Sequence, residues 1–314
     1  MLRRLLALLP TLILASIIVF VIVRLIPGDV IDLMLSQNDV AADKMGRDQL
    51  IATLGMDKPM WEQYFRWISA IVLHGDLGNS LWQGTPVADQ LRARLPVTFE
   101  LGLIALLVGL IIALPIGIYS AIRQDTTGDY LGRSFSILLL AVPSFWLGTM
   151  VVVFPSIWWG WSPSVDYVSL FDSPSANLSQ MLLPGIVLGA ALSAITMRMT
   201  RTMMLEVLRQ DYIRTAWAKG LDERLVIVRH ALRNALIPVV TLVGLQAPLL
   251  IGGAVIIEQI FVIPGMGLLL LDAVQQRDYP IITGVFSVVG VAVMLINLLV
   301  DLSYGFLDPK VRMR

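Results

Sequence analysis

The residues of this chain that could carry out chemistry are few and widely separated. Its four lysines stand at positions 44, 58, 219 and 310, and none follows a glycine, whereas a phosphate-binding P-loop needs a Gly-Lys-Ser/Thr run. The two histidines, His74 and His230, are far apart, and there is no cysteine to act as a thiolate or form a disulfide. No second ligand stands near His74 at metal-binding spacing. We therefore expect neither enzyme activity nor a bound cofactor or metal in this chain alone.

The most informative stretch is Glu206–Ala235, a charged segment between two apolar ones. It carries four acidic and six basic residues, not counting histidine. Gly220 can adopt the left-handed conformation that ends a helix, and Asp222 can cap the start of the next one. Apolar residues recur at helical spacing at 205, 208, 212 and 216, and again at 225, 228, 232 and 235. The pattern predicts two short amphipathic helices broken at Gly220.

This stretch resembles the cytoplasmic "EAA" loop of ABC importer permeases, in the version of the dipeptide, oligopeptide and nickel family. The resemblance is carried by DYIRTAWAKG at 211–220 and HALRNA at 230–235. Two departures from the general loop, at 214–216 and at 230–233, fit the peptide-type subgroup, and Trp217 is bulkier than the resemblance leads us to expect. The resemblance implies that the loop docks in a groove of an ATPase subunit. The residues expected to couple the permease to the ATPase are Glu206, Asp211, Tyr212, Arg214, Thr215, Ala216, Lys219, Gly220, His230, Arg233 and Asn234.

Composition indicates a membrane protein. Hydrophobic residues make up 57% and charged residues 15% of the chain, against about 25% charged in ordinary globular domains. The net charge of zero gives no sign of nucleic-acid binding. Because about 20 apolar residues span a bilayer, we predict an all-α integral membrane protein with six transmembrane helices, for which the resemblance implies the type I ABC importer permease fold. The uncharged runs are 5–23, 101–122, 134–165, 173–197, 235–257 and 281–300.

Positive charge predicts the orientation. Fifteen Lys and Arg residues lie at the N-terminus, in 123–133, in 198–233 and in the tail, and seven lie in the opposite loops. The positive-inside bias therefore puts both termini and the 206–235 loop in the cytoplasm. The run 134–165 exceeds one span, so its tryptophan-rich end is expected at the membrane interface. The expected domains are an N-terminal transmembrane helix 1–26, an extracytoplasmic helical insert 27–96 and a cytoplasmic tail 303–314, and the resemblance implies an ABC transmembrane type-1 domain at 94–302 that includes the 206–235 loop.

Within the insert, two or three helices are expected, of which one runs from about Asp39 to Leu54 and another starts near Asp57 with Pro59 in its first turn. The first apolar run is interpreted as an uncleaved span, since no small-residue cleavage site follows it. The resemblance extends over nearly the whole chain, including GDLGNS at 75–80 and EQIFVIPGMG at 258–267. Charged residues at span ends are default functional candidates, although snorkelling or interfacial hydrogen bonding also explains them. The candidate gate or interfacial residues are Glu100, Glu258, Gly265 and Asp301.

Together these features predict a transmembrane permease subunit of an ATP-driven importer in the bacterial cytoplasmic (inner) membrane. The resemblance implies di- or oligopeptide cargo, with nickel chelates and glutathione-type peptides as variants. It also implies a second homologous permease subunit, one or two ATPases carrying ATP and Mg, an extracytoplasmic solute-binding protein, and surrounding membrane lipid. The alternatives are an ion-coupled carrier or channel, which the absence of Asp, Glu or His within the spans disfavours, and a membrane scaffold.

Overall fold

The computed structural model describes residues 2–25, 51 and 57–307, with side chains for 10–25, 51 and 57–300, and in this part of the chain all regular structure is helical. A single isolated bridge joins Asn79 and Pro86. The all-α prediction is thus confirmed for the described residues. The helix expected from Asp39 to Leu54 falls almost entirely outside them, whereas the one expected near Asp57 is present and begins after Pro59.

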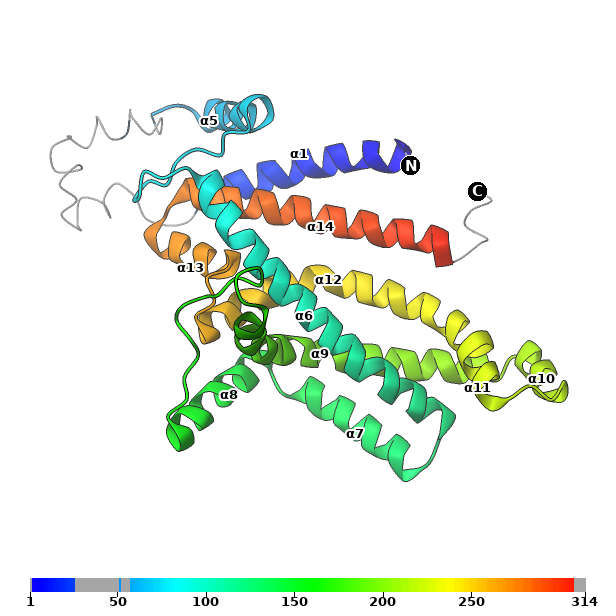
Figure 1. Cartoon of the computed structure of the whole chain (residues 1–314). Helices are drawn as coiled ribbons and strands as arrows, with labels where there is room; N and C mark the ends of the chain where they lie inside the picture. The colour runs from blue at the N-terminus through cyan, green and yellow to red at the C-terminus, as the bar shows by residue number, and fades with distance from the viewer. Residues whose placement is uncertain (1, 26–50, 52–56, 308–314) are drawn as a thin grey trace. The chain divides into compact units, whose positions relative to one another are not determined.

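The chain divides into two compact units, described separately here. The first comprises Met1–Pro96 and Leu268–Met294, and the second comprises Val97–Gly267 and Leu295–Arg314. The helices, labelled in Figure 1, are α1 (Leu2–Arg24), α5 (Met60–Ser69), α6 (Val87–Ile122), α7 (Thr127–Ala141), α8 (Ser144–Trp159), α9 (Pro174–Leu208), α10 (Asp211–Ala218), α11 (Glu223–Leu225), α12 (Arg233–Phe261), α13 (Met266–Gln276) and α14 (Tyr279–Leu307), with π-helical turns η1 (Ala70–His74) and η2 (Val226–Leu232).

In the part of the chain that the structure describes, four helical segments are long and apolar enough to cross a membrane, or five if the bent pair α7–α8 counts as one span. The four are α6, α9, the continuous segment Glu223–Phe261, and Tyr279–Val300. Of α1, the segment Pro10–Arg24 is apolar but shorter. The six-span count therefore remains a prediction.

The run 134–165, predicted as one span with an interfacial end, is broken into two helices. α7 and α8 meet at 90°. The break lies at Val142, which is extended (φ −91°, ψ 117°), and Pro143, after which α8 begins. A proline disfavours helical geometry in the residue before it, so Val142 ends α7.

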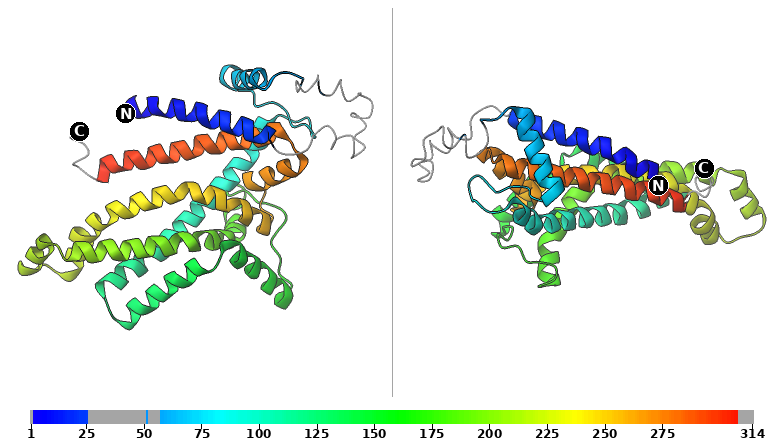
Figure 2. Two further views of the ribbon diagram at one scale, coloured as in Figure 1. Left: turned by 180° about the vertical axis from the view of Figure 1, so that it is seen from behind. Right: turned by 90° about the horizontal axis from the view of Figure 1, so that it is seen from above.

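In the second unit the core lies between α6, α9 and α12. α9 and α12 run side by side (Figures 1 and 2). A Cβ on Gly189 would collide with the backbone of Ala105, and one on Gly185 would collide with Ile104, so these two glycines allow α9 to pack closely against α6. At 35 residues α9 is about 52 Å long, more than the roughly 30 Å of a hydrocarbon core. Its charged C-terminal end can thus extend beyond the membrane.

In the first unit the GDLGNS motif is tied to the turn before α14. Ser80 is buried, and its hydroxyl donates to Asp278 Oδ2 at 2.6 Å, while the backbone N–H of Leu81 donates to the same oxygen at 3.1 Å. Trp82 Nε1 donates to the carbonyl oxygen of Gln276 at 2.7 Å. The insert is therefore fastened to residues nearly 200 positions away in the sequence.

Candidate functional site

The 206–235 loop folds as a sharp reversal rather than as two free-standing helices. α9 ends at Leu208, α10 begins at Asp211, and α11 continues through η2 into α12, so the second predicted helix is the start of a long one. Leu205 and Leu208 belong to α9, while Tyr212 and Ala216 belong to α10, which corrects the prediction of one helix through all four. Figure 2 shows α10 and α11 at the far ends of α9 and α12.

Two local features predicted for this reversal are confirmed. Gly220 has φ +74°, in the left-handed region, and a Cβ there would meet nothing within 4 Å. The strain of any other residue at this position would therefore come from the backbone alone. Asp222 caps α11, because its Oδ2 accepts a 3.1 Å hydrogen bond from the Arg224 backbone N–H.

The loop is held by its own small core. Ile213 and Ala216 of α10 pack against Val226 and Ala231 of η2. The core is completed by Ala121 of α6, Met204 of α9 and Ala235 of α12. The loop therefore rests directly on the ends of the three helices that form the centre of the second unit.

The predicted apolar stripe 225–228–232–235 is only half correct. Leu225 and Val228 are 39% and 55% exposed, whereas Val226 and Ala231 are buried. The reason is the π-helical turn η2, which places residues five apart on one face instead of three or four.

The exposed surface of the loop mixes large apolar side chains with charges. Tyr212 and Trp217 are exposed in addition to Leu225 and Val228, and Asp211 forms a solvent-exposed ion pair with Arg214 at 3.3 Å. Trp217, unexplained by sequence alone, is therefore part of an exposed surface that mixes apolar and charged side chains.

The other residues expected to couple do not all reach this surface. Ala216 is buried and belongs to the core of the loop instead. Asn234 links the two arms, because its Nδ2 donates to the Tyr212 hydroxyl at 2.9 Å and to the His230 carbonyl at 3.1 Å. His230 is half-buried. The remaining exposed ones are Glu206, Thr215, Lys219, Gly220 and Arg233.

Sequence reasoning missed a buried ion pair beside this loop. Asp129, at the start of α7, is fully buried and accepts from Arg201 of α9 through both oxygens, at 2.8 Å from Nε and 2.7 Å from Nη2. Ser120 of α6 donates to Asp129 Oδ1 and accepts from Arg201 Nε at 3.1 Å. The cluster of Ser120, Asp129 and Arg201, called the Asp129 clamp below, joins α6, α7 and α9 about one turn from the core of the 206–235 loop. The only sign of this cluster in the sequence is that all three residues stand near the ends of predicted spans.

The candidate gate or interfacial residue Glu258 is fully buried. Its Oε1 accepts from the Thr98 hydroxyl at 2.5 Å and its Oε2 from the Gly267 N–H at 2.7 Å, while Thr98 Oγ1 accepts from the Met266 N–H at 2.7 Å. A Cβ on Gly265 would collide with the carboxyl group. The two predicted residues are therefore brought together, and they hold the 262–267 turn.

Glu100 lies beside a polar loop. Its Oε2 accepts from the Tyr167 hydroxyl at 2.8 Å. Burial and this hydrogen bond raise the pKa of Tyr167 to about 12. The side chain of Asp301 lies outside the described residues. Among the described residues no group of three or more His, Cys, Asp or Glu could hold a metal ion.

Comparison with known proteins identifies the class to which this arrangement belongs. The family described as binding-protein-dependent transport system inner membrane component matches residues 113–313, and its N-terminal companion matches residues 1–102. The chain therefore belongs to the binding-protein-dependent transport system inner membrane components. It is the membrane component of a transport system rather than an ATPase.

Within this family the chain is similar to peptide permeases over its whole length. It is 39% identical to the dipeptide transport system permease protein DppB of Escherichia coli K12, over 99% of this chain and 98% of that one. It is 41% identical to the oligopeptide transport system permease protein AppB of Bacillus subtilis, over 98% of each. The glutathione transport system permease protein GsiC of Pectobacterium atrosepticum is 39% identical over 99% of this chain and 97% of its own.

Solved structures share the fold at much lower identity. A chain of the inward-facing MetNI methionine ABC transporter matches with a TM-score of 0.57 at 15% identity, covering 69% of this chain and 96% of its own. A chain of an amino acid ABC transporter crystallised with histidines matches with a TM-score of 0.54 at 12% identity, covering 68% and 92%. The chain therefore shares its fold with these chains of ABC transporters.

Proposed function

We propose that this chain is the permease subunit of an ATP-driven importer of small peptides in the bacterial cytoplasmic membrane. The observation that carries the proposal is full-length identity of 39–41% to permeases named for dipeptide and oligopeptide transport. Glutathione is itself a short peptide, so the similarity to GsiC favours glutathione-type cargo as a second candidate in the same class.

The 206–235 loop is the proposed contact with the ATPase. Its exposed apolar residues, including Trp217 and Val228, would fill a groove on the ATPase. Closure of the ATPases on ATP would then displace α10. The core around Ile213 would pass this displacement to the ends of α6, α9 and α12, alternating the pathway between inward-open and outward-open states.

The proposed assembly contains a second homologous permease subunit, one or two ATPases and an extracytoplasmic binding protein that delivers cargo. ATP and Mg would be held by the ATPases, and this subunit would bind no cofactor. Both termini and the 206–235 loop would be cytoplasmic, as the distribution of Lys and Arg favours.

Co-purification tests the proposal. An ATPase should remain with the permease through purification, and a peptide-loaded binding protein should stimulate its hydrolysis in liposomes. Peptide uptake that follows an imposed ion gradient, with no associated ATPase, would instead support the ion-coupled carrier.

Replacing Gly220 by valine should uncouple transport without preventing membrane insertion. Valine at φ +74° carries a backbone cost of about 1–2 kcal/mol, and α10 must shift to relieve it. We expect lower peptide uptake and less bound ATPase at normal expression. The matched control is Gly160→Val, which has φ +64° and equally open surroundings at the end of α8. Equal losses in both variants would argue against a specific role of Gly220 in coupling.

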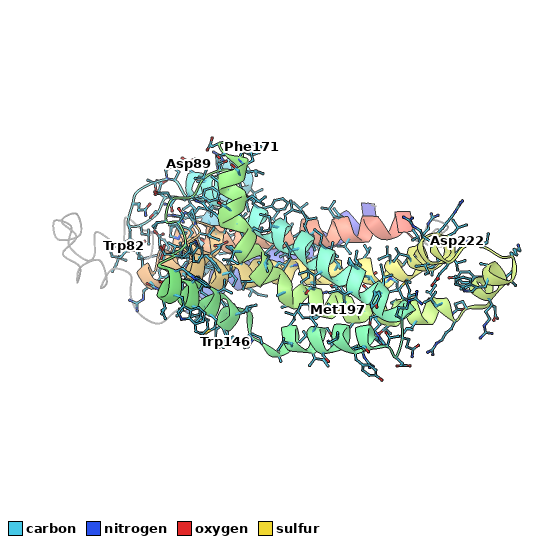
Figure 3. All side chains as sticks on the ribbon, turned by 60° about the horizontal axis from the view of Figure 1, so that its bottom comes forward. Trp82, Asp89, Trp146, Phe171, Met197 and Asp222 are labelled. Atoms are coloured by element: carbon cyan, nitrogen blue, oxygen red, sulfur yellow. The ribbon has the colours of Figure 1, made fainter. Side chains whose placement is uncertain are left out.

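The orientation can be tested with single cysteines, because the chain has none of its own. Phe171 is 94% exposed, and Arg209 is also exposed. Figure 3 shows Phe171 and the loop residue Asp222 at opposite ends of the second unit. Phe171→Cys should react with an impermeant thiol reagent in intact spheroplasts, and Arg209→Cys only after permeabilisation. The reverse pattern would exclude ATPase contact at the loop.

A further inference from the structure

The first unit contains an amphipathic helix whose apolar surface is only partly covered. α5 reads MWEQYFRWIS. At 100° per residue its aromatic and aliphatic side chains occupy one continuous arc, with Glu62 and Arg66 on the other side, joined by a 2.7 Å ion pair. Part of the apolar arc faces α1. The remainder carries Trp61 and Phe65, which are 65% and 61% exposed.

The contacts between α5 and α1 fix the level at which α5 lies along α1. The Arg24 Nε donates to Gln63 Oε1 at 2.9 Å, and the ring of Phe20 lies 5.3 Å from that of Tyr64 and 5.6 Å from that of Trp67. The hydroxyls of Ser16 and Tyr64 are 2.9 Å apart. α5 is therefore packed against the last three turns of α1.

The part of α1 that α5 contacts belongs to the uncharged run of α1. Arg24 is the first charged residue after that run, so Arg24 marks the edge of the hydrocarbon region. Phe20 stands four residues earlier, about 6 Å deeper along the helix. Helices that lie in the membrane interface bury their apolar face about 5–10 Å deep. In addition, α5 crosses α1 instead of running alongside it (Figures 1 and 2), as a helix in the membrane plane would cross a spanning one.

At the level of α5, α1 also exposes apolar side chains. On α1, Ile17, Ile18 and Ile22 are exposed along the same three turns. Beyond α5, the η1 turn exposes Val72 and Leu73. A spanning helix meets lipid on such a face, and a helix packed against it at the same depth meets the same lipid.

We propose that the outward face of α5 and η1, formed by Trp61, Phe65, Val72 and Leu73, is a membrane-contact surface. It lies among the lipid chains of the leaflet that surrounds the C-terminal half of α1. Tryptophan is well suited to this position because its ring is apolar while its N–H can reach the wet interface. α5 thus anchors the start of the 57–96 segment in the membrane, whereas sequence alone assigned the whole of 27–96 to the extracytoplasmic space.

Nitroxide accessibility tests the proposal. Phe65→Cys and Trp61→Cys, each the only cysteine in the full chain, are spin-labelled and reconstituted in phospholipid vesicles. The matched control is Arg66→Cys on the polar face of the same helix. Collision rates are measured with oxygen, which partitions into lipid, and with a water-soluble nickel chelate. The ratio of oxygen to nickel collisions should be several-fold higher at positions 65 and 61 than at 66.

Other occupants of this face give different results. Equal ratios at all three positions would place the face in water and overturn the proposal. Nickel-accessible labels that become protected on adding the binding protein would identify a protein docking surface instead. Labels reached by neither reagent would mean that the chain itself covers the face. Because the measurement requires no transport, its result does not depend on the proposed peptide import.

Discussion

Replacing Gly265 by alanine should prevent the 262–267 turn from forming and leave little folded permease. The new Cβ would occupy the position of the Glu258 carboxyl group. That group cannot swing away freely, because it is buried and held by Thr98 and by the N–H of Gly267. Leaving a buried carboxyl group without its hydrogen bonds costs about 1–3 kcal/mol for each group left unsatisfied, a large part of the roughly 5–15 kcal/mol typical of whole proteins.

The measurement is the yield and thermal midpoint of the purified permease in detergent. Gly252→Ala is the matched control, because it makes the same change in α12 at a place where a Cβ meets nothing within 4 Å. It should be neutral or slightly stabilising, since alanine favours a helix by about 1 kcal/mol over glycine. Glu258→Gln keeps the shape of the side chain and should lose less stability than Gly265→Ala. A normal yield of Gly265→Ala would show that the turn can open without damage.

Replacing Asp129 by alanine should be similarly damaging, for an electrostatic reason. It would leave the Arg201 guanidinium mostly buried and without its carboxylate partner. Removing one member of a buried ion pair typically costs about 3–5 kcal/mol. Because the Asp129 clamp lies one turn before the core of the 206–235 loop, surviving protein should also lose peptide uptake more than ATPase binding.

Two further variants separate the clamp from general effects of lost charge. Asp89→Ala removes an exposed carboxylate 3.4 Å from Arg92, and surface pairs of this kind contribute less than about 1 kcal/mol. The double variant Asp129→Ala/Arg201→Met leaves no buried unpaired charge, since Arg133, the other partner of Asp129, is 40% exposed, and should recover part of the lost thermal midpoint. Arg201→Met alone lowers the thermal midpoint by some amount relative to the unmodified protein. If adding Arg201→Met to Asp129→Ala lowers the midpoint by the same amount, the two residues do not act as a pair.

Much of the 206–235 loop could be read from the sequence because its determinants are local. Gly220 is left-handed and Asp222 is a helix cap, as predicted, since both depend on the backbone of a few neighbouring residues. The faces of the helices were less predictable. The π turn η2 shifts Val226 and Ala231 to the inside, and a 3.6-residue period cannot anticipate a local change in helical repeat.

The break between α7 and α8 shows a similar limit. Pro143 is visible in the sequence, but a proline within an apolar run can kink a span, start a new helix or be accommodated without a bend. The 90° bend depends on how α8 packs on α9 and α12. The hydropathy of a run gives its length in apolar residues but not the directions in which the helices within it point.

The sequence by itself determined the membrane class, the helical fold and the family, because apolar run length and short motifs are properties of consecutive residues. The tertiary structure decided which distant residues meet. Ser120, Asp129 and Arg201 form one clamp, Thr98 and Glu258 hold one turn, and Ser80 reaches Asp278. Polar groups removed from water must find partners, but the choice of partner follows from helix packing in three dimensions, which no spacing along the chain encodes.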